Sequence, residues 1–232
     1  VYHAHIATGE LHLRPILNLK KKEDVERFYN LSKDVALLVK KHRGSLSGEH
    51  GDGRLRGEWI PLMYGERIYG LMKEMKEVWD AENVFNRGKI IDTPKMNTSL
   101  RYKGINPKNI TTYYSFENQK GFLCAIEQCN GSADCRKSLQ AGGKMCPTFQ
   151  ITNQESQTPR ARANILREKL SFPTKENPFN DKEIKKILDD CLMCKACKSE
   201  CPSNVDITKL KSEFLQHYYD ATYYPLNILL IG

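Results

Sequence analysis

The chain has 232 residues, of which 40% are hydrophobic and 28% are charged, and its formal net charge is +8. This length suggests one or two domains with modest cores. The basic residues alternate with acidic ones and lack interleaved aromatic residues, so we interpret them as solvated faces and expect no nucleic-acid binding. No run of about 18 apolar residues is present, which predicts a chain without a transmembrane helix.

The two ends of the sequence suggest that it continues on both sides. It starts without an initiator methionine or a signal peptide, and it stops within an apolar run. We therefore expect an internal piece of a longer polypeptide, in which residues 223–232 begin a further domain.

Alternation of strands and amphipathic helices characterises the N-terminal part. Residues 1–9 and 11–18 are predicted strands, and residues 24–41 are a predicted amphipathic helix. A short turn and strand at 44–48 precede a second helix at 66–81, whose Met and Trp residues recur at helical spacing and are expected in the core. The order β–β–α–β–α predicts an α+β fold with helices on one face of an antiparallel sheet.

Histidines and a glutamate in this part have the spacing of metal ligands. His5 and His12 lie seven residues apart, and Gly9 between them allows a sharp bend. Two imidazoles and the carboxylate of Glu49 would form a three-ligand site with an open position, suited to a catalytic divalent metal such as zinc, manganese or iron. On spacing alone, surface histidines remain the alternative interpretation.

These motifs resemble the C-terminal part of the FAD-linked oxidases, which include glycolate oxidase and the D-lactate and D-2-hydroxyglutarate dehydrogenases. The resemblance covers residues 1–92 and depends on three stretches: His5-x6-His12, G-E-H-G at 48–51 and N-x-G-K-I at 86–90. The family's usual first motif is H-A-G-D-G-N-L-H. Residues 5–12 keep its end histidines and central glycine but lack its aspartate and asparagine.

The resemblance implies a truncated, ferredoxin-like cap domain that holds the substrate. His5, His12 and Glu49 would be metal ligands that bind a 2-hydroxyacid. His50 would be the base that takes the hydroxyl proton as hydride leaves for flavin, a role that suits an imidazole. FAD would be bound mainly by a domain upstream of residue 1, so the piece alone is not expected to oxidise substrate.

A segment rich in Pro, Asn, Gly and Thr, residues 93–117, is predicted to be an extended linker. All eight cysteines of the chain follow it. Clustered cysteines with C-x2-C spacing indicate metal binding in a reducing compartment and not a disulfide framework.

The most specific motif is C-x2-C-x2-C-x3-C-P at residues 191–202. Cys191, Cys194 and Cys197 can converge on one iron–sulfur cubane, whereas Cys201, next to proline, would ligate a second cluster. Zinc is the alternative metal for such a set of thiolates.

The first half-site has irregular spacing. It reads Cys124-x4-Cys129-x5-Cys135-x10-Cys146-Pro147, and the middle ligand of a regular site would stand at position 132, where serine, a poor iron ligand, is found. Either Cys124 supplies the missing thiolate, or the cluster has three protein ligands, as a [3Fe–4S] or a labile [4Fe–4S] core. We prefer the first explanation because it uses all eight cysteines. This assignment gives two sets, cluster A with Cys124, Cys129, Cys135 and Cys201, and cluster B with Cys146, Cys191, Cys194 and Cys197.

Helices are predicted around both half-sites. They are expected at 160–170, after a capping-box-like start at Asn180, and after Asp206 as an N-cap. This arrangement resembles the α-helical ferredoxin of the iron–sulfur subunits of succinate and glycerol-3-phosphate dehydrogenases, and we assign it to residues 118–222.

Motifs at 129–136, 145–147 and 159–164 extend the resemblance to the whole chain, as a fragment of the large fused bacterial D-lactate-dehydrogenase-like proteins. The resemblance implies oxidation of a D-2-hydroxyacid through FAD, with electrons passing through two iron–sulfur clusters, expected as [4Fe–4S], to a quinone or a carrier protein. It also implies a location in the cytoplasm or at the inner membrane face. The alternative is an electron-transfer module without substrate chemistry of its own.

Overall fold

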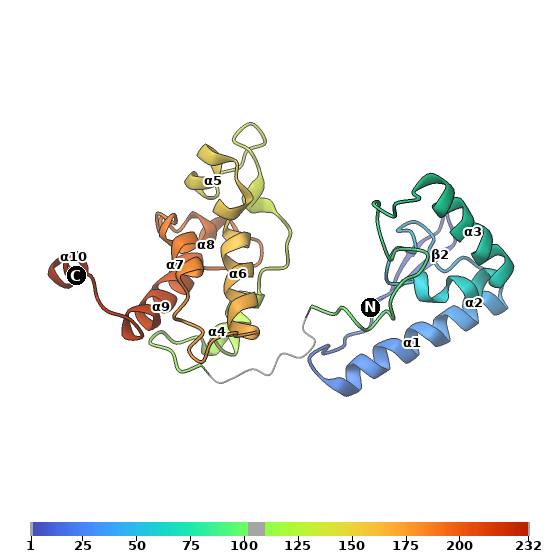
Figure 1. Cartoon of the computed structure of the whole chain (residues 1–232), viewed down its shortest axis with the longest axis horizontal. Helices are drawn as coiled ribbons and strands as arrows, with labels where there is room; N and C mark the ends of the chain where they lie inside the picture. Colours follow the sequence, from blue (N-terminus) through green and yellow to red (C-terminus); the bar gives the residue numbers. More distant parts are fainter. Residues whose placement is uncertain (1, 102–109, 232) are drawn as a thin grey trace. The chain divides into compact units, whose positions relative to one another are not determined.

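The computed structural model describes residues 2–101 and 110–231, and the chain divides into two compact units, Val1–Ile105 and Asn106–Gly232 (Figure 1). Residues 102–109, which belong to the predicted linker 93–117, lie outside the described residues. Within the described ranges, no helix is both long and apolar enough to cross a lipid bilayer.

The first unit combines a β-hairpin with helices. Strand β1 (Tyr2–His5) pairs antiparallel with β2 (Glu10–Leu13), and helices α1 (Lys22–Lys41), α2 (Ile60–Tyr64) and α3 (Glu66–Trp79) follow (Figure 1). The mixed helix and strand content agrees with the predicted α+β class. The strands are shorter than predicted, however, and a third strand at 44–48 is absent from this described segment, so that part of the prediction was wrong.

A small core connects α1 to the short 3₁₀ turn that precedes α2. Ala36, Trp59 and Met96 are buried together. The indole nitrogen of Trp59 donates a hydrogen bond to Ser32 Oγ at 2.9 Å. Glu58 accepts from the Met96 amide at 2.8 Å, so the segment after α3 is fastened to this core as well.

The prediction that the Met and Trp residues of the second helix lie in the core was wrong. Helix α3 forms where the periodicity predicted it, but Met75 is 61% exposed and Trp79 is 81% exposed. Helical spacing indicates that an apolar stripe exists, whereas burial also needs an opposing surface. In the described part of this unit, no other element covers the apolar stripe of α3, and none of the α3 residues is buried.

In the described residues of the second unit, helices joined by loops are the regular secondary structure, and no strand is present. Its helices are α4 (Phe122–Glu127), α5 (Pro147–Thr152), α6 (Pro159–Ser171), α7 (Lys182–Asp189), α8 (Ala196–Glu200), α9 (Ile207–Asp220) and α10 (Leu226–Ile231). A single core joins α4, α6, α7 and α9, and it includes several cysteines. Cys129, Cys135 and Cys197 are therefore held in place by packing within this core.

Side-chain caps start three of these helices. Asp206 accepts from the Lys209 amide at 3.1 Å, as predicted, and Thr158 caps α6 in the same way. The cap of α7 is Asp181 and not Asn180, because the Asp181 carboxylate accepts from the first amides of the helix. The inward face of α9 is formed by four buried side chains, Ile207, Leu210, Phe214 and Tyr218.

The buried Glu213 of α9 fastens the start of this unit. Its two carboxylate oxygens accept from the backbone amides of Tyr113 and Tyr114, each at 2.9 Å. A carboxylate that is 0% exposed needs such partners. The last residues of the predicted linker are thus held against α9.

Candidate metal centre and iron–sulfur cavities

The hairpin brings the two predicted histidine ligands together. In its register, His5 lies opposite Glu10 and His3 lies opposite His12. Side chains of directly paired residues point to the same face of a sheet, so His5, Glu10 and His12 share one face. Gly9 closes the turn at φ +67°, a conformation that favours glycine.

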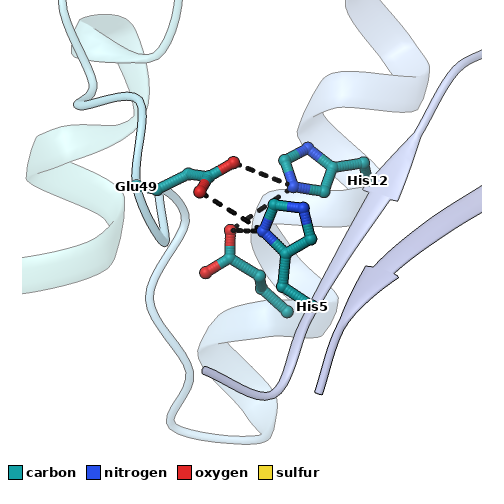
Figure 2. Close-up of side chains that lie close together, drawn as sticks. His5, His12 and Glu49 are labelled. Carbon is teal, nitrogen blue, oxygen red and sulfur yellow. Dashed lines mark ion pairs between the residues drawn. The ribbon is translucent and has the colours of Figure 1, made fainter. Parts of the chain in front are cut away.

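Four side chains converge on one point. The ligand atoms of His5, Glu10, His12 and Glu49 all lie within 4.8 Å of one another. Glu49, from the loop after α1, faces both histidines, with its carboxylate 3.3 Å from His5 Nδ1 and 3.1 Å from His12 Nε2 (Figure 2). Glu10 Oε1 lies 3.7 Å from His5 Nδ1 and 3.4 Å from His12 Nε2. The three residues predicted from sequence are therefore neighbours.

Two observations fit a cation at this point. His12 Nε2 is buried and makes no hydrogen bond among the described residues, although carboxylate oxygens lie close to it. A nitrogen whose lone pair faces a metal would have this environment. A Cβ built on Gly48 would come within 2.5 Å of the Glu10 carboxylate, so the glycine makes room for that carboxylate. Two imidazoles and two carboxylates are a donor set that suits zinc, manganese or iron.

Glu10 was missed by the sequence analysis. It stands where the family motif has asparagine, and the motif comparison noted only that the asparagine was lost. The hairpin register was the signal that could have found it, because a tight turn at Gly9 places residue 10 opposite His5.

His50 lies beside the four-residue group. Its Nε2 is 2.9 Å from Glu49 Oε1, and its side chain is 65% exposed. The ring centroid is 5.5 Å from that of His12. His50 is thus held next to the group by a shared carboxylate while most of its ring remains accessible.

Four of the cysteines line one cavity in the second unit. This cavity, which we call cavity B, is bordered by Cys146, Cys191, Cys194 and Cys197. They are the four cysteines predicted for cluster B, brought together from the start of α5 and from the loop and helix around α8. Burial raises the pKa of the Cys197 thiol to about 11, so the thiolate there needs a cation to replace the proton.

A second cavity, cavity A, has fewer cysteines of its own. Cys129, Cys135 and Cys201 line it, together with Cys197, which borders both cavities. Burial raises the pKa of Cys135 as well. The fourth residue predicted for cluster A, Cys124, lies half-buried in α4 and does not border cavity A.

A buried arginine borders cavity B. Arg162 of α6 is 1% exposed, and its Nη1 donates to Cys146 Sγ at 3.3 Å. Its other hydrogen bonds go to the Gln157 side-chain oxygen at 3.1 Å and the Ile187 carbonyl at 3.3 Å. No carboxylate of the described residues pairs with this guanidinium, so its charge faces the cysteines.

Lys211 contacts the backbone of a cysteine that borders cavity B. Its Nζ donates to the Cys191 carbonyl at 2.8 Å, and burial lowers its pKa. The sequence analysis identified neither Arg162 nor Lys211, because the sequence of an amphipathic helix does not show whether a single basic side chain points towards a cavity or towards solvent.

Comparison with known proteins assigns a class to both units. Residues 1–90 match the C-terminal domain of the FAD linked oxidases, and residues 128–206 match a 4Fe-4S dicluster domain. No solved structure matches the chain. The expected class is thus confirmed: the chain joins an FAD-linked oxidase segment to an iron–sulfur segment, as in fused oxidoreductases.

The relatives that align with nearly the whole chain are D-2-hydroxyglutarate dehydrogenases. The proteins of that name from Escherichia coli (strain K12) and Pseudomonas putida are each 28% identical to the chain over 98% of it, which corresponds to 26% of their own length. The glycolate oxidase subunit GlcD of Bacillus subtilis is 24% identical over 37% of the chain and 18% of its own length. The chain thus spans about a quarter of the relatives that it matches over most of its length.

Proposed function

We propose that the chain is part of a fused D-2-hydroxyacid dehydrogenase, in which residues 1–92 bind the substrate through a divalent metal and residues 118–222 relay electrons through two iron–sulfur clusters. The observation that carries this proposal is the convergence of His5, Glu10, His12 and Glu49. The names of the D-2-hydroxyglutarate dehydrogenases among the relatives support a D-2-hydroxyacid as the substrate class. The first unit would belong to a ferredoxin-like cap, and FAD would be bound mainly by a domain that precedes this segment.

The four converging side chains would hold the metal. His5, His12 and Glu49 were predicted as ligands from sequence, and the position of Glu10 supports a fourth. A bound divalent cation would polarise the hydroxyl of the substrate and lower its pKa. Two carboxylates would neutralise the charge of that cation, so the site would have no net charge before the anionic acid binds.

His50 would accept the hydroxyl proton. Its Nε2 lies 2.9 Å from Glu49 Oε1, and an Nε2–H that donates there leaves the lone pair on Nδ1. That free nitrogen would be the proton acceptor, and the Glu49 carboxylate would stabilise the imidazolium that forms. Most of the ring is accessible, so a substrate can reach it.

The cysteines of the second unit would hold the clusters that take electrons from flavin. Cavity B supplies Cys146, Cys191, Cys194 and Cys197 for one cluster. Cavity A supplies ligands for the other. The final acceptor would be a quinone or a carrier protein.

Anaerobic mixing of the full-length protein with pairs of D- and L-2-hydroxyacids tests this function. We expect the flavin absorbance to bleach with a D-2-hydroxyacid, D-2-hydroxyglutarate being the first to try, and not with its L-enantiomer. A chelator that removes the divalent metal should abolish the bleaching. Flavin that stays oxidised with every acid would favour an electron-transfer module without substrate chemistry.

Replacing Glu10 by glutamine should weaken metal binding by about 10- to 100-fold, because the variant loses one charged ligand but keeps its shape. Titration of the metal-free protein with Mn²⁺ or Zn²⁺ measures the effect. Glu74→Gln on the exposed side of α3 is the matched control and should bind the metal as the wild type does. Equal affinity in the Glu10 variant would remove Glu10 from the ligand set.

A further inference from the structure

The supply of thiolates is unequal between the two cavities. Cavity B has four cysteines at its border. Cavity A has three of its own, Cys129, Cys135 and Cys201, and shares Cys197 with cavity B. In two-cluster ferredoxins, the first three cysteines of a C-x2-C-x2-C-x3-C-P motif serve one cluster and the fourth serves the other. Cys197 thus belongs to cavity B, and cavity A is one thiolate short.

Ser132 stands where the missing thiolate would be. The spacing Cys129-x2-Ser132-x2-Cys135 is that of a regular half-site with serine in the middle. The structure puts Ser132 at the border of cavity A, in the loop between the two cysteines. The sequence position and the structural position of the missing ligand therefore coincide.

Nothing in the surroundings of Ser132 favours its hydroxyl as an iron ligand. The residue is exposed, and its amide donates to the side chain of Asn130 at 3.0 Å. The Ser132 side chain also hydrogen-bonds the Asp134 carboxylate, so the hydroxyl already has a carboxylate partner. An alcohol also loses its proton less readily than a thiol, and its oxygen is a harder ligand than the soft thiolate sulfur that iron–sulfur clusters prefer. This corner of cavity A is thus open to solvent and lacks an anionic donor from Ser132.

Cys124 does not compensate for the missing thiolate. It lies in α4 and borders neither cavity A nor cavity B. Its neighbours in the helix, Leu123 and Ala125, are buried, and Cys124 itself is half-buried, as expected of a small apolar residue on a packed helix.

We infer that the cluster of cavity A is a [3Fe–4S] core held by the thiolates of Cys129, Cys135 and Cys201, with no protein ligand at the corner next to Ser132. This inference rests on the iron–sulfur half of the proposed function and does not depend on the substrate. A cuboidal core with three irons needs one thiolate for each iron, which is the number that cavity A supplies. Cavity B, with four thiolates, would hold a [4Fe–4S] core.

The test uses the full-length protein, purified without oxygen, in four forms: wild type, Ser132→Cys, Ser132→Ala and Cys124→Ala. Iron and sulfide are counted, and EPR spectra are recorded after mild oxidation, a state in which a [3Fe–4S] cluster is paramagnetic and a [4Fe–4S] cluster is silent. We expect the oxidised wild type to show the three-iron signal. Ser132→Cys should lose that signal and gain about one iron per chain, because it restores the fourth thiolate.

The two alanine variants keep the inference open to refutation if Ser132→Cys fails to fold. Ser132→Ala and Cys124→Ala should both keep the signal and the iron count of the wild type. Loss of iron in Cys124→Ala would make Cys124 the fourth ligand, and a changed signal in Ser132→Ala would make the hydroxyl a ligand. A wild type that contains iron but shows no three-iron signal would overturn the inference alone. A protein without iron would overturn the electron-relay function as well.

Discussion

Replacing His12 by alanine in the full-length protein is expected to lower kcat/KM for the D-2-hydroxyacid by roughly 1,000-fold, because the loss of metal polarisation is worth several kcal/mol. His12 Nε2 lies between the two carboxylates, 3.4 Å from Glu10 and 3.1 Å from Glu49, and it is buried without a hydrogen bond in the described part of the chain. Its removal leaves two carboxylates facing each other with one imidazole. We expect the bound metal to be lost together with turnover.

Steady-state kinetics and metal analysis of the same preparations measure this effect. His42→Ala is the matched control, because His42 is an exposed histidine at the end of α1, outside the group of four. It should retain both metal and activity. If His12→Ala kept the activity of the wild type, the first unit would be a scaffold and the metal-dependent mechanism would be wrong.

Replacing Arg162 by methionine is expected to have opposite effects on the protein with and without its clusters. In the cluster-free protein, the buried guanidinium has only neutral partners, the Gln157 and Ile187 oxygens and the Cys146 thiol, so removing its charge should leave the free energy of unfolding unchanged or raise it. In a protein loaded with the proposed clusters, the same charge would face an anionic cluster. Its loss should then reduce the free energy of unfolding by about 1.5–3 kcal/mol, the usual contribution of a hydrogen bond to a charged group.

The redox potential provides a second measurement on this variant. A positive charge beside the cluster favours the reduced, more negative state, so Arg162→Met should lower the midpoint potential of the cavity B cluster by on the order of 50 mV. Arg167→Met, on the same helix but bonded to Asn164, is the control and should leave the potential unchanged. An unchanged potential in Arg162→Met would mean that the guanidinium has only a packing role.

The parts of the site that depend on local spacing could be predicted from the sequence. The motif of residues 191–202 predicted three neighbouring cysteines, and Cys191, Cys194 and Cys197 border the same cavity. The pair His5 and His12 could be predicted because a glycine between them permits a hairpin. In each case a few residues of chain determine the distance between the ligands.

The parts that depend on tertiary contacts could not be predicted. Glu10 needed the exact pairing of β1 with β2, and Arg162 needed the direction of one side chain within a helix bundle. The burial of the α3 stripe was wrongly predicted because amphipathicity does not say which surface is opposite, and Trp79 is exposed. From the spacing, Cys124 was preferred as the fourth ligand of cluster A over a cluster with three protein ligands, but spacing alone could not show that residue 124 does not border cavity A.

The transfer of electrons from substrate to clusters is the central claim, and EPR of the full-length protein after anaerobic addition of a D-2-hydroxyacid tests it most directly. We expect signals of reduced clusters in the wild type within the time of turnover. His12→Ala should show them only after addition of dithionite, which bypasses the substrate site. Clusters that stay oxidised in the wild type while its flavin bleaches would contradict the account.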